Sequence, residues 1–303
     1  MLRSLLLYLS EHESARKLLS HNTLGRRLAQ RFIAGEELDD AVRTARRLNE
    51  EGLDATLDYL GEEVAEPAGA REAGAMYVAL LDRIAAEGLR SHVSIKLTQL
   101  GLTISPELAC EQLRAVADRA IYHQNFVRID MEGSAYVDNT LRLFREVDAP
   151  RDALGVVIQS YLYRSEKDVE ELLKMRARVR LVKGAYKEPP EIAFPAKSEV
   201  DTSFVKLMKM LLSSGGYHAI ATHDTRMITA TENFARAQNL STDRFEFQML
   251  YGIRRQLQRN LAARGYHVRV YVPFGRQWYP YFMRRLAERP ANVLFLAKQF
   301  FRK

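Results

Sequence analysis

Residues 92–98 read HVSIKLT, and this short stretch decides how the chain folds. Successive side chains of an extended strand point to opposite sides, so the apolar residues at 93, 95 and 97 share one face and the polar residues, Lys96 among them, share the other. Residues 126–131, reading FVRIDM, repeat the alternation with Arg128 and Asp130 on the polar side. The pattern predicts strands with one apolar and one polar face.

Short apolar runs of this kind recur eight times. They occupy residues 56–60, 92–98, 126–131, 155–161, 180–185, 218–223, 245–250 and 267–274. Between them lie longer stretches with helical spacing and many charges, such as residues 70–86, 106–122, 166–176 and 202–212. An open antiparallel sheet would alternate in the same way, but these helical stretches are too long for hairpins. Eight strand–helix units therefore predict a parallel sheet closed into a (βα)8 barrel of the TIM type.

A barrel also predicts how the chain divides into domains and where the polar strand faces point. Residues 1–51 look helical and precede the first strand, so we expect an N-terminal helical arm followed by a catalytic barrel over residues 52–303. If the apolar strand faces meet the helices, the polar faces look into the barrel. Barrel interiors are usually filled with Val, Ile and Leu, so ionic groups there need partners, water or a ligand. We expect a charged, functional mouth at the carboxyl ends of the strands.

Composition limits the remaining classes. The 303 residues are 47% apolar with a formal net charge of +7, which suits a packed core and a charged, solubilising surface. Cys110 is the single cysteine, which excludes an internal disulfide or a multi-thiolate metal site and indicates a reducing compartment. The apolar run at residues 5–9 is too short for a signal sequence or a membrane span. The sequence predicts a cytoplasmic protein and leaves open a peripheral contact with the inner face of the membrane.

Several common sites have no support in the sequence. It contains neither G-x-G-x-x-G after a strand nor a Walker loop, so a nucleotide cofactor would have to bind at the barrel mouth. His218 and His223 point to opposite faces of one predicted strand, and we expect no metal. His223 precedes Asp224 at a strand end, where it either binds a ligand or is structural. Cys110 falls in an amphipathic helix and there is no G-x-S-x-G, so acyl transfer is not supported.

Lysines at strand ends are better candidates. Lys96 and Lys183 lie on β-rich runs, where lysine is uncommon, and each either forms a Schiff base, binds an anion or is simply solvated. Gly184, next to Lys183, permits a flat ligand to approach the backbone closely.

A pair of arginines follows the last strand. Pro280 suits a first helical turn, which places Arg284 and Arg285 on the helix after that strand. Two guanidiniums can bind a carboxylate, and Glu288, four residues after Arg284, is placed to orient one of them. Solvent exposure of both arginines is the alternative.

From about residue 50 onward the chain resembles the proline dehydrogenases of the monofunctional bacterial type. The resemblance rests on seven motifs in order, each at or just beyond a strand end. They are SIKL (94–97), IDME (129–132), VIQSY (157–161), RLVKGAY (180–186), ATHD (221–224), EFQMLYG (246–252) and YFMRRL (281–286).

The resemblance implies an FAD-dependent barrel that oxidises L-proline to 1-pyrroline-5-carboxylate and passes electrons to a membrane quinone. By similarity, the substrate-binding positions are Lys96, Leu250, Tyr271, Arg284 and Arg285, and the catalytic or flavin-tuning positions are Asp130 and Arg180. The flavin-contacting positions are Met131, Gln159, Lys183, Gly184, Ala185, Thr222 and His223, with Tyr186 beside the site. The product would pass to a separate 1-pyrroline-5-carboxylate dehydrogenase. The bulk of Tyr271 favours proline over hydroxyproline.

On this reading, cations at the mouth bind the proline carboxylate and disfavour the protonated ring nitrogen. The main rival is a Schiff-base or phosphosugar lyase on the same barrel that uses Lys96 or Lys183. A nucleic-acid-binding protein is disfavoured, because suggestive cations such as Lys96 lie on predicted strands that face inward.

Overall fold

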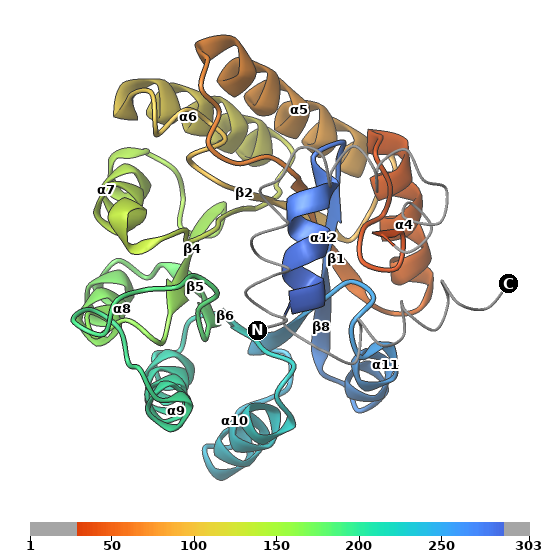
Figure 1. The fold of residues 1–303 in the computed structure, drawn as a ribbon. Coiled ribbons are helices and arrows are strands. Elements are labelled where there is room, and N and C mark those ends of the chain that lie inside the picture. The colour runs from red at the N-terminus through yellow and green to blue at the C-terminus, as the bar shows by residue number, and fades with distance from the viewer. Residues whose placement is uncertain (1–28, 288–303) are drawn as a thin grey trace, which may run out of the picture.

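The computed structural model describes residues 29–287 (Figure 1). Its centre is a closed barrel of eight parallel strands in sequence order, which confirms the predicted (βα)8 fold. The strands are β1 (Asp54–Tyr59), β2 (Ser91–Ile95), β3 (Val127–Ile129), β4 (Leu154–Gln159), β5 (Arg178–Val182), β6 (His218–Ala221), β7 (Phe245–Leu250) and β8 (His267–Phe274). Each begins within two residues of its predicted start. The second to sixth strands end two or three residues before their predicted limits. After the fifth, Gly184 takes a φ of +119°, which is not an extended conformation.

Helices connect the strands and form the outer ring seen in Figure 1. They are α5 (Pro67–Ala86), α6 (Pro106–Tyr122), α7 (Val137–Glu146), α8 (Ser165–Lys174), α9 (Lys197–Ser213), α10 (Thr225–Ala237) and α11 (Arg255–Ala263), with a short 3-10 helix η1 (Ser134–Tyr136) before α7. Local sequence explains their starts. Pro67 and Pro106 open α5 and α6, and the hydroxyl of Ser105 accepts a hydrogen bond from the amide of Leu108.

The first and last described helices depart from a simple repeat. Helix α4 (Leu38–Glu50) packs against β1 and β8, where a helix following β8 would be expected. Helix α12 (Trp278–Ala287) packs instead with Leu60, which follows the carboxyl end of β1, and in Figure 1 it lies in front of the strands. The chain thus brings α12 to the barrel mouth. The predicted helical arm is described only from residue 29, so residues 1–28 lie outside the described part, as do residues 288–303 of the predicted barrel.

The two strand faces separate as the alternation predicts. Val93, Ile95 and Leu57 belong to the apolar core, whereas Ser94 and Arg128 are buried among polar groups. Burial of so many polar side chains inside one barrel requires partners, and the structure groups them at two levels.

The amino ends of the strands hold one level, which we call the floor cluster: Asp54, Arg128, Arg178, Glu246 and Arg269. Arg269 donates to both carboxylate oxygens of Glu246, at 3.0 and 3.2 Å, and to Asp54 at 3.1 Å. Arg128 donates to the carbonyl of Val156 at 3.1 Å. The Arg128 and Arg178 guanidiniums lie 4.6 and 4.3 Å from the centre of the Phe126 ring. Ion pairs and stacked cations therefore fill this end of the barrel.

Candidate active site

Five side chains at the carboxyl ends of the strands form the second level, which we call the mouth cluster: Asp58, Lys96, Asp130, Arg180 and Tyr271. Lys96 Nζ donates to Asp58 Oδ1 at 2.9 Å and to the Tyr271 hydroxyl at 3.3 Å. It also lies 3.6 Å from Asp130 Oδ2. Four of these residues were singled out from the sequence, and the barrel closes them into one network.

Asp130 is the centre of the mouth cluster. Its Oδ1 accepts from Arg180 Nη1 at 2.6 Å and from Ser94 Oγ at 2.7 Å, and its Oδ2 accepts from the Tyr271 hydroxyl at 2.8 Å. Burial acts to raise the pKa of Asp130, but the charges of Arg180 and Lys96 outweigh it and hold that pKa below its usual value. Asp130 is therefore a carboxylate that fixes the positions of its neighbours.

Lys96 stays charged despite its burial. Burial acts to lower the pKa of Lys96, but the charges of Asp58, Tyr271 and Asp130 raise it well above its usual value. A buried ammonium held between two carboxylates can bind a further anion and is a poor nucleophile.

Arg180 has donors left over. Its Nε and Nη2 are buried and have no hydrogen-bond partner among residues 29–287, although its Nη1 is bonded to Asp130 and Ser94. Such donors cost free energy unless an acceptor meets them, and functional sites are a common reason to keep them. They fit a ligand that brings acceptor atoms, as the nitrogen and carbonyl edge of a flavin ring does.

Helix α12 contributes Arg284 and Arg285. Arg284 forms a two-point ion pair with Glu62, with Nη2 2.8 Å from Oε1 and Nη1 3.2 Å from Oε2. This differs from the sequence expectation, in which Glu288 orients the arginine; Glu288 lies outside the described residues. The Arg285 guanidinium lies 5.1 Å from the Tyr281 ring centre.

A second group of charges lies at the ends of β5 and β6. Lys183 pairs with Asp201 and donates to Asp224 at 2.8 Å, and Arg226 donates to the same two carboxylates at 2.6 and 3.2 Å. Burial acts to raise the pKa of Asp224, but hydrogen bonds from Lys183 and Arg226 hold it well below its usual value. This group gathers two cations beside the N-terminus of α10, which Asp224 itself caps by accepting from the Arg226 amide. A phosphate bound there would have to compete with Asp201 and Asp224 for these cations.

Glu188 in the loop after β5 connects that loop to Ser134, after β3. Glu188 accepts from the Ser134 amide at 2.7 Å and from the Ser134 hydroxyl at 2.6 Å. A Cβ at Gly184 would lie 2.4 Å from the Tyr161 ring. The glycine therefore lets the Tyr161 ring pack against the backbone, where the sequence predicts a flat ligand. Ala185 and Tyr186 follow, and Tyr186 is 39% exposed.

The remaining expected cofactor positions lie at or just beyond the ends of β3, β4 and β6. Gln159 donates to the Glu132 carbonyl at 2.9 Å, next to Met131, which is buried. His223 Nε2 accepts from the Leu250 amide at 2.9 Å. Thr222 accepts from the Asp224 amide at 3.1 Å.

The comparison with known families decides between the readings. The family model described as "Proline dehydrogenase" matches residues 41–298. The chain belongs to the proline dehydrogenase family. It is 43% identical to proline dehydrogenase 1 of Bacillus subtilis over the full length of both chains. It is 41% identical to the proline dehydrogenase of Deinococcus radiodurans over 89% of each chain.

A solved structure shares the fold. The structure of proline utilization A (PutA) from Bdellovibrio bacteriovorus inactivated by N-propargylglycine is similar at a TM-score of 0.83 and 28% identity. The match covers 91% of this chain and 34% of that one, so this chain spans about a third of that protein's length.

Sequence reasoning missed three acids or hydroxyls of this candidate site: Asp58, Glu62 and Ser94. Asp58 and Ser94 lie on the polar faces of predicted strands, so the alternation could have found them. Glu62 lies in an irregular segment between β1 and α5, and no local pattern connects it to Arg284.

The sequence predicts that the cations at the mouth act as free positive charges. In the structure, Lys96, Arg180 and Arg284 each have a carboxylate within ion-pair distance.

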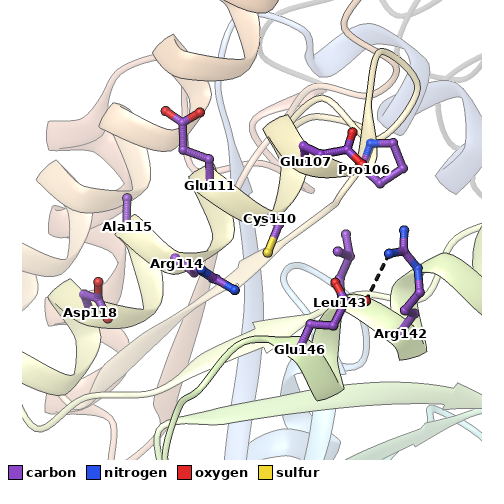
Figure 2. A pocket seen from close by; sticks show the side chains of 10 residues that line it. All are labelled: Pro106, Glu107, Cys110, Glu111, Arg114, Ala115, Asp118, Arg142, Leu143 and Glu146. Carbon is purple, nitrogen blue, oxygen red and sulfur yellow. Dashed lines mark hydrogen bonds and ion pairs between the residues drawn. The ribbon is translucent and has the colours of Figure 1, made fainter.

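A groove of about 550 Å³ lies elsewhere on this member of the proline dehydrogenase family, between α6 and α7 (Figure 2). Cys110 lines it, together with charged residues of both helices. None of the residues expected at the barrel mouth lines it, so the groove is separate from the candidate active site.

Proposed function

We propose that the chain oxidises L-proline to 1-pyrroline-5-carboxylate, with FAD as the hydride acceptor and a membrane quinone as the final electron acceptor. Membership of the proline dehydrogenase family supports the substrate. The observation that carries the proposal is the mouth cluster, in which buried Lys96 and Arg180 converge on Asp130 at the carboxyl end of the barrel. Active sites of (βα)8 enzymes lie at this end.

The substrate carboxylate would bind between Lys96 and Arg284. Lys96 is a buried cation, and Arg284 uses one donor of Nη1 and one of Nη2 for Glu62, so its Nε edge remains to bind a second carboxylate. Asp58, Asp130 and Glu62 balance these cations, which argues against net positive charge as the factor that keeps the ring nitrogen unprotonated. Leu250 and the Tyr271 ring would pack against the apolar ring of proline.

FAD would supply the hydride acceptor, which no side chain can provide. The Nε and Nη2 donors of Arg180, which have no partner among residues 29–287, suit the flavin ring, and a cation there would stabilise negative charge on it. Lys183 and Arg226 suit the phosphates, and Gln159 and His223 lie at neighbouring strand ends. The chain's own task is to hold proline beside the ring and exclude water.

The electron acceptor and the metabolic partner are proposed from chemistry. A membrane quinone requires the protein to reach the bilayer surface, and among residues 29–287 no helix is long and apolar enough to cross it. Contact from the cytoplasmic side is the arrangement we propose. The product, 1-pyrroline-5-carboxylate, would be oxidised by a separate dehydrogenase.

A Schiff-base lyase is the alternative for this barrel, and the geometry opposes it. Such an enzyme needs a neutral lysine. Lys96 is held as an ammonium ion between Asp58 and Asp130, and Lys183 is ion-paired with Asp201 and Asp224.

The test is the absorption spectrum of purified protein, recorded without oxygen before and after adding L-proline. We expect flavin bands that bleach when proline is added. A colourless protein that forms a borohydride-trapped adduct with a keto substrate would support the lyase instead.

A further inference from the structure

The segment between β1 and α5 contains a strained residue beside the substrate side of the site. Glu63 has a φ of +50°, a left-handed conformation that non-glycine residues adopt at a cost in free energy. Its neighbour Glu62 forms the two-point ion pair with Arg284. The backbone at Glu63 therefore decides where the Glu62 carboxylate points.

One hydrogen bond holds this backbone from inside the barrel. The Glu63 amide donates to Thr98 Oγ1 at 3.2 Å, and the Thr98 side chain is fully buried just beyond β2. A second contact on Glu63, from the Tyr136 hydroxyl to Oε1, is longer at 3.4 Å and involves the flexible end of the side chain.

Thr98 is itself held by Glu132. The Thr98 hydroxyl and amide bond to the two carboxylate oxygens of Glu132, at 2.5 and 3.1 Å. Glu132 is buried, two residues after Asp130, and its carbonyl accepts from Gln159. A continuous chain of hydrogen bonds thus runs from Glu132 through Thr98 to the Glu63 backbone, and from there along one peptide bond to Glu62.

We propose that Thr98 and Glu132 are positioning residues for substrate binding, which hold the strained backbone at Glu63 so that Glu62 keeps the Arg284 guanidinium turned toward the substrate carboxylate. The inference rests on the proposed function, in which Arg284 binds that carboxylate. It assigns to Thr98 a role in the affinity for proline and none in the chemical step. Loss of the Thr98 hydroxyl should therefore change KM and leave kcat nearly unchanged.

The experiment compares Thr98→Val with Thr98→Ser in a dye-reduction assay with L-proline. Valine keeps the shape and removes the hydroxyl, so we expect the KM for proline to rise about five- to tenfold with kcat within twofold of wild type. Serine keeps the hydroxyl and should restore the KM to within twofold. Thr98→Ala, which should also raise the KM, repeats the test if the valine variant does not fold.

Thr103→Val is the matched control. The Thr103 hydroxyl donates to the Val64 carbonyl at 3.2 Å in the same segment, but takes no part in the chain to Glu62. We expect its KM to stay within twofold of wild type. Thr103 is exposed whereas Thr98 is buried, so this variant controls for the loss of a threonine hydroxyl that bonds to this segment, and Thr98→Ser controls for packing at position 98.

A double-mutant cycle with Glu62→Gln completes the test. Because Thr98 acts through Glu62, adding Thr98→Val to Glu62→Gln should raise the KM no more than about twofold further. Wild-type activity with an unchanged KM in Thr98→Val, or effects that multiply in the double variant, would overturn the inference alone. Wild-type protein that does not oxidise proline would overturn the proposed function and this inference with it.

Discussion

The barrel buries ionic groups at both ends, and the two ends use them differently. In the floor cluster, Arg269 meets Glu246 and Asp54, and Arg128 meets backbone carbonyls and an aromatic ring. In the mouth cluster, the charges converge on one carboxylate. Arg180 keeps two donors that meet no acceptor within the described part of the chain, at the end where the strands of such barrels carry catalysis. Arg128 and Arg178 in the floor also each keep a buried Nε without a hydrogen-bond partner among residues 29–287. The mouth differs in that one guanidinium keeps two such donors, at the carboxyl ends of the strands, where a ligand can meet them.

The largest difference should appear when one acid is removed from each cluster. Asp130→Ala leaves Lys96 and Arg180 without their shared carboxylate, and breaking a buried charge pair costs roughly 3–5 kcal/mol. We expect kcat/KM for proline to fall on the order of 10³-fold. Glu246→Gln, in the floor cluster, should lower the melting temperature and leave kcat/KM within about threefold. Equal losses of activity would mean that the two ends do not differ in function.

Two buried acids, Glu132 beside the mouth and Glu246 in the floor, should respond to pH in opposite directions. Burial raises the pKa of Glu132, beside the mouth, to about 7, so folding favours its protonated form. Its contribution to the free energy of unfolding is full below pH 4.5 and falls by about 3 kcal/mol as the pH rises to 7.

Glu246 in the floor behaves in reverse. Burial acts to raise its pKa, but Arg269 outweighs this and lowers it, so its contribution is present above about pH 4.5 and is lost as the pH falls further. Denaturant titrations of Glu132→Gln and Glu246→Gln across pH should each remove one of these slopes. Unchanged slopes in both variants would contradict the assignment.

Arg284 tests the substrate side of the mouth. Each hydrogen bond to a charged partner contributes roughly 1.5–3 kcal/mol, so Arg284→Met should raise the proline KM about 10- to 100-fold. Arg276→Met is the control, since Arg276 is exposed and pairs with Glu37 at the surface. An unchanged KM in steady-state assays would remove Arg284 from the site.

Tyr271 tests selectivity, with the smallest expected effect. Its hydroxyl donates to Asp130, and its ring lies beside Arg180, so the wall it forms has little freedom to move. We expect kcat/KM for proline to exceed that for hydroxyproline by about tenfold, the ratio that roughly 1.4 kcal/mol of unfavourable contact gives. Comparable values for the two substrates would show that Tyr271 does not set this preference.

The sequence predicts the barrel well because alternation along each strand is a local property. The same pattern places Lys96, Asp130, Arg180 and Tyr271 inside, and the closed sheet brings them together. It does not reveal Glu62, whose partner Arg284 lies more than two hundred residues away. Alternation also predicts that Arg128 and Arg180 both point into the barrel. Only the folded structure shows that Arg128 lies at the amino ends of the strands, where it is structural, and Arg180 at the carboxyl ends, where it is a candidate catalytic residue.

The most direct test is the rate at which proline bleaches the bound flavin in anaerobic stopped-flow mixing, measured for wild type, Asp130→Ala and Glu246→Gln. The account predicts bleaching in wild type, a rate within about threefold of it in the floor variant, and a loss on the order of 10²-fold or more in the mouth variant. Flavin content and melting temperature show that each variant is folded. The account would be contradicted by equal bleaching rates in Asp130→Ala and wild type, or by a wild-type flavin that proline does not bleach.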